Sequence, residues 1–124
     1  PETCALKDLT EFCLFEGSIS YHSSGEEIYW QFNQSKEEKD RDLQIAKKIS
    51  KETTYNLLPE EEINLGNGYK DWFIENYKKP ALTMEVSPYV GERKVPQKYY
   101  QQIFQQNKNV PIIFAKEILN NSLN

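Results

Sequence analysis

The chain contains 124 residues, which is enough for one compact domain with its own core and too few for two ordinary domains. Hydrophobic residues make up 38% and aromatic residues 13% of the chain, so the composition excludes an intrinsically disordered protein. The formal net charge of -4 has the wrong sign for a surface that neutralises phosphates, and nucleic acid is therefore not an expected partner. No apolar run approaches the roughly 20 residues that span a bilayer, and residues 1–14 lack the pattern of a signal peptide, so we expect neither feature.

The two cysteines are too few for a disulfide framework. Cys4 and Cys13 fall in one predicted helix, where nine residues at about 1.5 Å rise separate them by roughly 13 Å, beyond the ~7 Å reach of a disulfide. A metal pair would need ligands two to four residues apart and further partners, but the chain contains a single histidine. We therefore predict two unpaired, buried thiols.

The N-terminal part of the sequence predicts one helix and two strands. Apolar side chains recur at helical spacing within residues 1–12, which predicts an amphipathic helix. Residues 14–21 then alternate between apolar and polar side chains, which predicts a strand that ends at His22. After a turn at residues 23–25, a second alternation over residues 27–32 predicts a second strand.

The middle of the sequence predicts two helices separated by a loop. Ser35 and Glu38 have the spacing of a capping box, and the helix predicted over residues 36–52 carries one narrow apolar stripe. We interpret its many charges as a water-facing surface rather than a binding surface. Residues 53–68, with an acidic triplet at 60–62, show no clear period and are predicted to form a loop. Helical spacing returns over residues 69–77, and Pro80 follows the end of this helix.

The C-terminal part predicts one strand and two helices. Residues 81–86 alternate, so Glu85 shares a face with Ala81 and Thr83 while the large apolar residues point the other way. A loop is predicted over residues 88–96, followed by a helix over 99–107. Asn109 can cap a last helix whose first turn contains Pro111, and the Asn-rich tail from residue 120 is expected to fray.

Strands interleaved with helices predict the α/β class, as a partial α/β/α layer fold in which helices cover a mixed sheet. Only three strands are evident from the pattern, whereas an average sheet has about five or six. We therefore expect residues 1–124 to form a single domain that is part of a larger one.

Two side chains stand out as candidates for chemistry. The single histidine, His22, excludes every two-histidine metal site, and Glu26 lies four residues later but in a turn, where that spacing does not align two ligands. Without further context, a histidine such as His22 is more often a satisfied polar residue at the end of a strand than a metal ligand. Glu85 lies within an apolar strand, where lost hydration would raise its pKa toward the range of a general base. The alternative for Glu85 is a salt bridge to a neighbouring helix.

Three motifs, in order along the chain, resemble the zinc carboxypeptidase family. The segment YHSSGEEIYW at residues 21–30 is similar to the family's third zinc-ligand region, and GYKDWF at 68–73 is similar to its specificity loop. PALTMEV at 80–86 is similar to the strand that carries the catalytic glutamate. PYVGERKVP at 88–96 is similar to the branch that cleaves γ-D-glutamyl-diamino acid bonds in bacterial cell-wall peptides. The resemblance covers nearly the whole chain.

The resemblance implies a zinc-dependent peptidase in which His22 is one metal ligand and Glu85 is the general base. It implies that Lys70, and Tyr69 beside it, bind substrate, with Lys70 suited to an extra carboxylate such as that of diaminopimelate; an exposed lysine is the alternative. The tyrosine that many members place over the substrate has no clear counterpart, because its position by count falls near Ile63. Tyr69 lies close by in the sequence, but the resemblance does not assign the role of that tyrosine to it.

The resemblance also implies that residues of the family's centre lie outside this chain. The HxxE pair of zinc ligands and the arginines that bind substrate have no counterpart here. The chain therefore resembles the C-terminal half of the catalytic domain, with the N-terminal half as its partner and cell-wall peptide as its substrate. Such a fragment is expected to be inactive alone and to self-associate; its bacterial compartment, cytoplasm or cell envelope, is left open. The alternative is a non-catalytic binding or structural module derived from the same fold.

Overall fold

A computed structural model describes residues 1–60 and 68–122 of the chain. The N-terminal elements are α1 (Glu2–Cys13), β1 (Ser18–Ser23), β2 (Glu27–Tyr29), α2 (Lys36–Thr53) and β3 (Asn56–Leu57). The C-terminal elements are α3 (Tyr69–Tyr77), β4 (Ala81–Val86), the short 3₁₀ helix η1 (Gln97–Tyr99), α4 (Tyr100–Asn107) and α5 (Val110–Ser122). These alternating elements confirm the α/β class.

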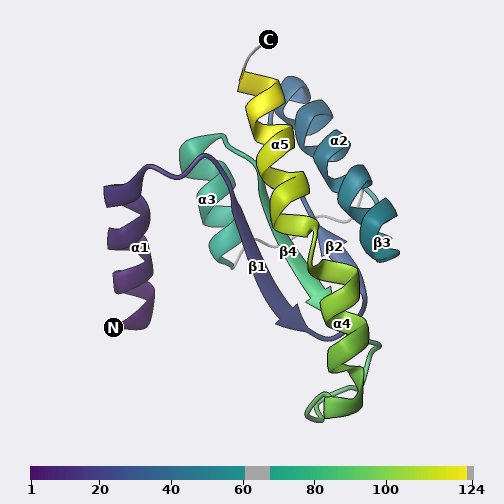
Figure 1. Ribbon diagram of the computed structural model, residues 1–124. Coiled ribbons are helices and arrows are strands. Elements are labelled where there is room, and N and C mark those ends of the chain that lie inside the picture. The colour runs from purple at the N-terminus through teal and green to yellow at the C-terminus, as the bar shows by residue number, and fades with distance from the viewer. Residues whose placement is uncertain (61–67, 123–124) are drawn as a thin grey trace.

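The four described strands form one mixed sheet in the order β1-β4-β2-β3. β4 pairs with β1 in parallel and with β2 antiparallel, and β2 pairs with β3 in parallel. β1 and β4 therefore point the same way, and their C-terminal ends lie side by side (Figure 1).

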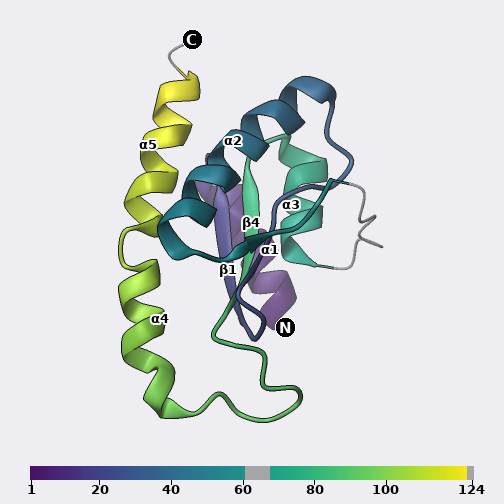
Figure 2. The same ribbon diagram turned by 90° about the vertical axis from the view of Figure 1, so that its right-hand side faces the viewer.

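Helices cover both faces of the sheet. Figure 2 shows α3 on one side of β1 and β4, with α2 and α5 on the other. β4 contributes to both packed layers because its side chains alternate: Leu82 and Met84 face α2 and α5, whereas Ala81 packs with Phe73 and Ile74 of α3. This placement confirms the predicted alternation along residues 81–86.

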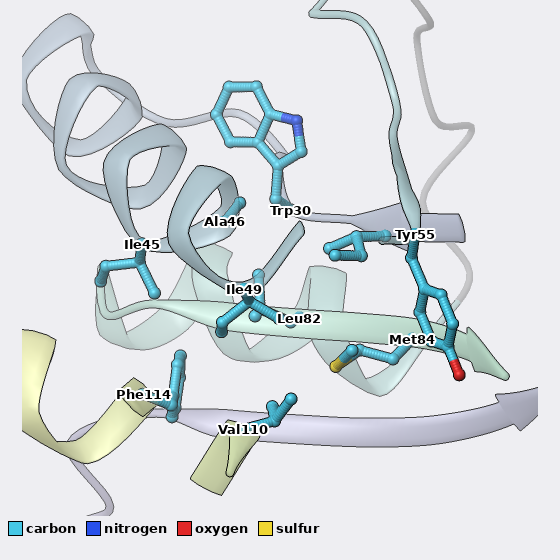
Figure 3. Close-up of a cluster of buried hydrophobic side chains, with 10 residues drawn as sticks. Trp30, Ile45, Ala46, Ile49, Tyr55, Leu82, Met84, Val110 and Phe114 are labelled. Carbon is cyan, nitrogen blue, oxygen red and sulfur yellow. The ribbon is translucent and has the colours of Figure 1, made fainter. Parts of the chain in front are cut away.

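The larger core lies between the sheet and the helices α2 and α5 (Figure 3). Its buried members are Ile28, Trp30, Ile45, Ala46, Ile49, Tyr55, Leu82, Met84, Val110 and Phe114. Full burial of each large apolar side chain contributes about 1.5–3 kcal/mol. The one stripe of apolar side chains on α2 supplies Ile45, Ala46 and Ile49, as the sequence pattern predicted.

The capping box at the start of α2 is confirmed. The backbone N–H of Glu38 donates to Ser35 Oγ at 3.3 Å, and the backbone N–H of Ser35 donates to Glu38 Oε2 at 2.7 Å. Two N–H groups that lack partners within the helix are satisfied in this way, so α2 begins at Lys36.

The predicted bounds of two strands were wrong, and a third strand was not predicted. The first strand was expected at residues 14–21, but Leu14 adopts a left-handed conformation that ends α1, and β1 begins only at Ser18. β1 also ends later than predicted, at Ser23, so His22 lies inside the strand rather than directly after it. The second strand stops at Tyr29; after it, Trp30 packs into the larger core and Phe32 packs against the cluster on the other face of the sheet. β3 was not predicted, because a strand of two residues shows no periodicity in the sequence.

Two further expectations about the ends of the chain were wrong. Cys4 and Cys13 are free as predicted, but both are exposed rather than buried. The reason is that α1 lies beside α3 instead of on the sheet (Figure 1). The buried residue of α1 is Thr10. The expected fraying from residue 120 is replaced by helix up to Ser122, where Asn121 and Ser122 side chains bond back to carbonyls one turn earlier. None of the helices in the described residues is long and apolar enough to cross a membrane.

Candidate functional site

His22 and Glu85 are direct neighbours at the C-terminal ends of β1 and β4. The parallel register pairs their Cα atoms, and side chains in register on adjacent strands point to the same face of a sheet. His22 Nδ1 lies 3.8 Å from Glu85 Oε1, and the exposed fractions of the two side chains are 57% and 20%. The sheet therefore brings together two residues that are 63 positions apart in the sequence.

Glu27 completes a row of three ionisable side chains across the sheet. The antiparallel register of β2 and β4 pairs Glu27 with Glu85, so Glu85 lies between His22 on one side and Glu27 on the other. The phenol of Tyr29, two residues along β2, donates a hydrogen bond to Glu27 Oε2 at 3.2 Å. Glu27 therefore adds a second, oriented carboxylate to the site.

The pKa of Glu85 is raised above its ordinary value. Partial burial is the main cause, because it disfavours the charged form; the neighbouring His22 lowers the pKa, and the Glu27 carboxylate raises it again. A carboxylate that holds protons more tightly than usual is a better general base than an exposed one. This direction agrees with the chemistry inferred from the sequence.

Two loops hold the end of the sheet in place. The Gly25 N–H donates to the Ser87 carbonyl at 3.0 Å, and the Val90 N–H donates to Ser24 Oγ at 3.0 Å. The turn after β1, which contains a cis peptide between Ser23 and Ser24, is thus tied to the loop after β4. The backbone that carries His22 and Glu85 is fixed by these bonds as well as by the strand ladder.

A pocket of about 370 Å³ opens at this edge of the sheet. Two glutamates, two tyrosines and the turn after β1 line it: Glu27, Glu85, Tyr29, Tyr89, Ser24 and Gly25. The pocket can hold a small polar group within reach of Glu85.

Glu85 has its ion-pair partner on a strand, and Glu26 has its hydrogen-bond partner on a helix. The ion pair of Glu85 joins it to His22 on a neighbouring strand, so the expected alternative of a salt bridge to a helix is wrong. Glu26 Oε1 accepts a hydrogen bond from Gln102 of α4 at 3.2 Å and does not join His22. Within residues 1–60 and 68–122, no three His, Cys, Asp or Glu side chains are grouped as a complete metal site.

Lys70 lies in the interior, so the alternative of an exposed lysine is wrong. It belongs to α3, its exposed fraction is 4%, and its Nζ donates to the Gln31 carbonyl at 2.8 Å and to the Asp71 carboxylate. The phenol of Tyr69 shares a 2.8 Å hydrogen bond with Thr10 Oγ1 of α1. The structure thus brings neither residue into the row formed by His22, Glu85 and Glu27, and their part in substrate binding stays a prediction. Ile63 and Glu61–Glu62 of the acidic triplet lie outside the described residues.

Glu27 is the site residue that the sequence analysis missed. A signal is present in the sequence, because the alternation over residues 27–32 places Ile28 and Trp30 on one face of the strand and Glu27 and Tyr29 on the other. The pairing of β2 with β4, which brings Glu27 beside Glu85, could not be read from the alternation.

Comparison with known proteins gives one informative similarity. No protein-family model matches the chain. The chain is 30% identical over 106 residues to γ-D-glutamyl-L-diamino acid endopeptidase 1 of Lysinibacillus sphaericus. The match covers 86% of this chain but 25% of that relative, so the chain spans about a quarter of the length of the endopeptidase to which it is similar.

Proposed function

We propose that this chain is the part of a zinc-dependent peptidase that carries the general base, Glu85, and one metal ligand, His22. The substrate class is the γ-D-glutamyl-diamino acid bond of bacterial cell-wall peptides. The observation that carries the proposal is the pairing of His22 with Glu85 at the ends of two adjacent parallel strands. The similarity to an endopeptidase and the resemblance of three motifs to zinc carboxypeptidases support it.

The residues fit a zinc site in part. The imidazole of His22 is more than half exposed and is a common zinc ligand, but one imidazole supplies one of the three protein ligands that a catalytic zinc needs. The remaining ligands would come from outside the described residues, in the part of the protein that corresponds to the HxxE pair of the family. Zinc supplies a Lewis acid that lowers the pKa of water and polarises a carbonyl group.

The role of Glu85 follows from its position. Its carboxylate accepts the proton of the attacking water and later donates it to the leaving amine, so the same group acts first as base and then as acid. The strand ladder on both sides of β4 and the two tied loops keep this carboxylate in a fixed place. His22 keeps the neighbouring position on β1, where it can hold the metal.

The proposal includes a partner, the remainder of the catalytic domain. Large apolar side chains of α1 and the segment after it are exposed, including Phe12 at 86% and Leu14 at 67%. β1 is the outer strand of the described sheet, so its free edge is available for a further strand. Both features support a half-domain that is inactive alone. Lys70 and Tyr69 can serve as substrate-binding residues in this complex only if they exchange their internal partners.

The substitution Glu85→Gln in the complete protein tests the proposed base. Glutamine has nearly the same volume and keeps hydrogen bonding, but it cannot accept the proton. We expect hydrolysis of a γ-D-glutamyl-diamino acid peptide to fall by at least about a thousandfold, while zinc content and melting temperature change little. Glu37→Gln, at an exposed position on α2, is the control for loss of one charge. More than about a tenth of the original rate in Glu85→Gln would exclude Glu85 as the base and favour the non-catalytic module.

A further inference from the structure

Glu27 has no role in the chemistry proposed above, although it lies beside the proposed base. It is the register partner of Glu85 on β2 and is partly buried. Its side chain is held by the hydrogen bond from the Tyr29 phenol at 3.2 Å. A partly desolvated carboxylate costs free energy unless a cation or a donor compensates it, and one phenol satisfies a single lone pair.

The wall of the pocket has the chemistry of a site for a cation. Its lining includes two residues with carboxylates, Glu27 and Glu85, and two residues with phenol groups, Tyr29 and Tyr89. Among the described residues, the wall contains neither lysine nor arginine. Once Glu85 is engaged with the reacting water, Glu27 is the carboxylate that is free to pair with a positive group.

The substrate class supplies such a group. A diamino acid has two amino groups, and when one of them is in the scissile amide bond the other is a free ammonium ion at neutral pH. An ammonium ion has three N–H donors and no acceptor, so a carboxylate with phenol oxygens nearby is its natural partner. The amino acid on the leaving side of the bond is also the part of the substrate nearest to Glu85, which protonates the leaving amine.

We propose that Glu27 determines specificity by binding the free ammonium group of the diamino acid. This inference rests on the proposed function and goes beyond it, because it names the group that is recognised and the residue that recognises it. Tyr29 is the positioning residue, because its phenol donates the hydrogen bond that orients the Glu27 carboxylate.

The test compares two substrates that differ only in the ammonium group: γ-D-glutamyl-L-lysine and γ-D-glutamyl-L-norleucine, each as the same blocked peptide. We expect the complete protein to prefer the lysine substrate in kcat/KM, and we expect Glu27→Gln to reduce that preference by about 10- to 100-fold. The reduction should come from slower hydrolysis of the lysine substrate, with the norleucine rate nearly unchanged. Glu27→Lys should reverse the preference.

Glu26→Gln is the matched control, because Glu26 is the neighbouring residue but its side chain contacts Gln102 of α4. It should leave the ratio of the two substrates unchanged. Equal loss on both substrates in Glu27→Gln, or an unchanged ratio, would overturn the inference while leaving the proposed function intact. If the complete protein hydrolyses neither substrate, the inference fails. If it hydrolyses no γ-D-glutamyl-diamino acid peptide at all, the proposed function fails with it.

Discussion

Glu85 derives its character from its neighbours in the sheet. The carboxylate is partly buried on β4, with an imidazole on one side and a second carboxylate on the other, and burial is the main reason why its pKa is raised. Part of this environment could be predicted from the sequence, because alternation along residues 81–86 placed Glu85 on the face of the small residues. The contribution of Glu27 could not, since strand pairing depends on contacts between distant segments.

For His22, too, the sequence predicts part of the environment, and the rest depends on strand pairing. Composition and the spacing to Glu26 argue against a local metal pair. In the structure, Glu26 Oε1 accepts a hydrogen bond from Gln102 of α4. The prediction that His22 is a metal ligand rests on the motif resemblance and not on the residues themselves. Its contact with Glu85 is a consequence of parallel pairing between β1 and β4, which no local pattern encodes.

At the residue scale, the buried carboxylate of Asp42 makes the free energy of unfolding depend on pH. Its carboxylate is buried on α2 and accepts hydrogen bonds from Gln34 Nε2 at 2.8 Å and from Arg41 Nε at 2.7 Å. Burial nevertheless raises the pKa of Asp42 above its usual value near 3.8. The folded state therefore binds this proton more tightly than the unfolded state does. The stabilising contribution is complete below about pH 4 and is lost as the pH rises through the raised pKa.

We therefore expect the free energy of unfolding, relative to that of Asp42→Asn, to fall as the pH rises from about 3.5 and then to level off. Urea titrations of both chains across that range measure this difference. A difference that grows with pH would mean that Arg41 lowers the pKa more than burial raises it.

At the scale of elements, the packing of α5 against the sheet requires the helix to come close to the backbone just before β1. A Cβ atom at Gly17 would lie 2.6 Å from Ile118 Cδ1 and 2.8 Å from Phe114 Cε1, so a larger residue fits there only if these two side chains move. Overpacking of this kind typically costs about 1–3 kcal/mol. We expect Gly17→Ala to lower the melting temperature by several degrees.

A second substitution separates steric overlap from any effect on the backbone. Ile118→Ala removes the Cδ1 atom that the new methyl group would meet, so the double variant should lose less stability than the two single changes predict together. Strictly additive losses in thermal melting would contradict the steric explanation.

The elements also show where local sequence patterns are sufficient and where they fail. α2 was predicted closely because a capping box and an apolar stripe are local signals. β3 was not predicted, because Asn56 and Leu57 form a strand only through pairing with β2. α1 has the expected helical pattern, but its position beside α3, with both cysteines exposed, depends on tertiary contacts such as Thr10 to Tyr69.

At the scale of the whole molecule, the exposed apolar surface of α1 should cause self-association of the isolated chain. Phe12 is 86% exposed, and burial of such a side chain against a second copy contributes about 1.5–3 kcal/mol. We expect concentration-dependent dimers or larger species in analytical ultracentrifugation, weakened about tenfold or more by Phe12→Asp.

Leu119→Asp is the control, because Leu119 is also exposed, at 62%, but lies on α5. It should change the association constant much less. A chain that stays monomeric at high concentration would show that the face of α1 needs no partner.

The central claim is that this chain supplies one zinc ligand and the base to a centre that other residues complete. Zinc analysis after dialysis against a mild chelator tests it most directly. We expect stoichiometric zinc in the complete protein and in its Glu85→Gln variant, loss of that zinc in His22→Ala, and none in the isolated chain. Stoichiometric zinc in the isolated monomeric chain, or in His22→Ala of the complete protein, would contradict the claim.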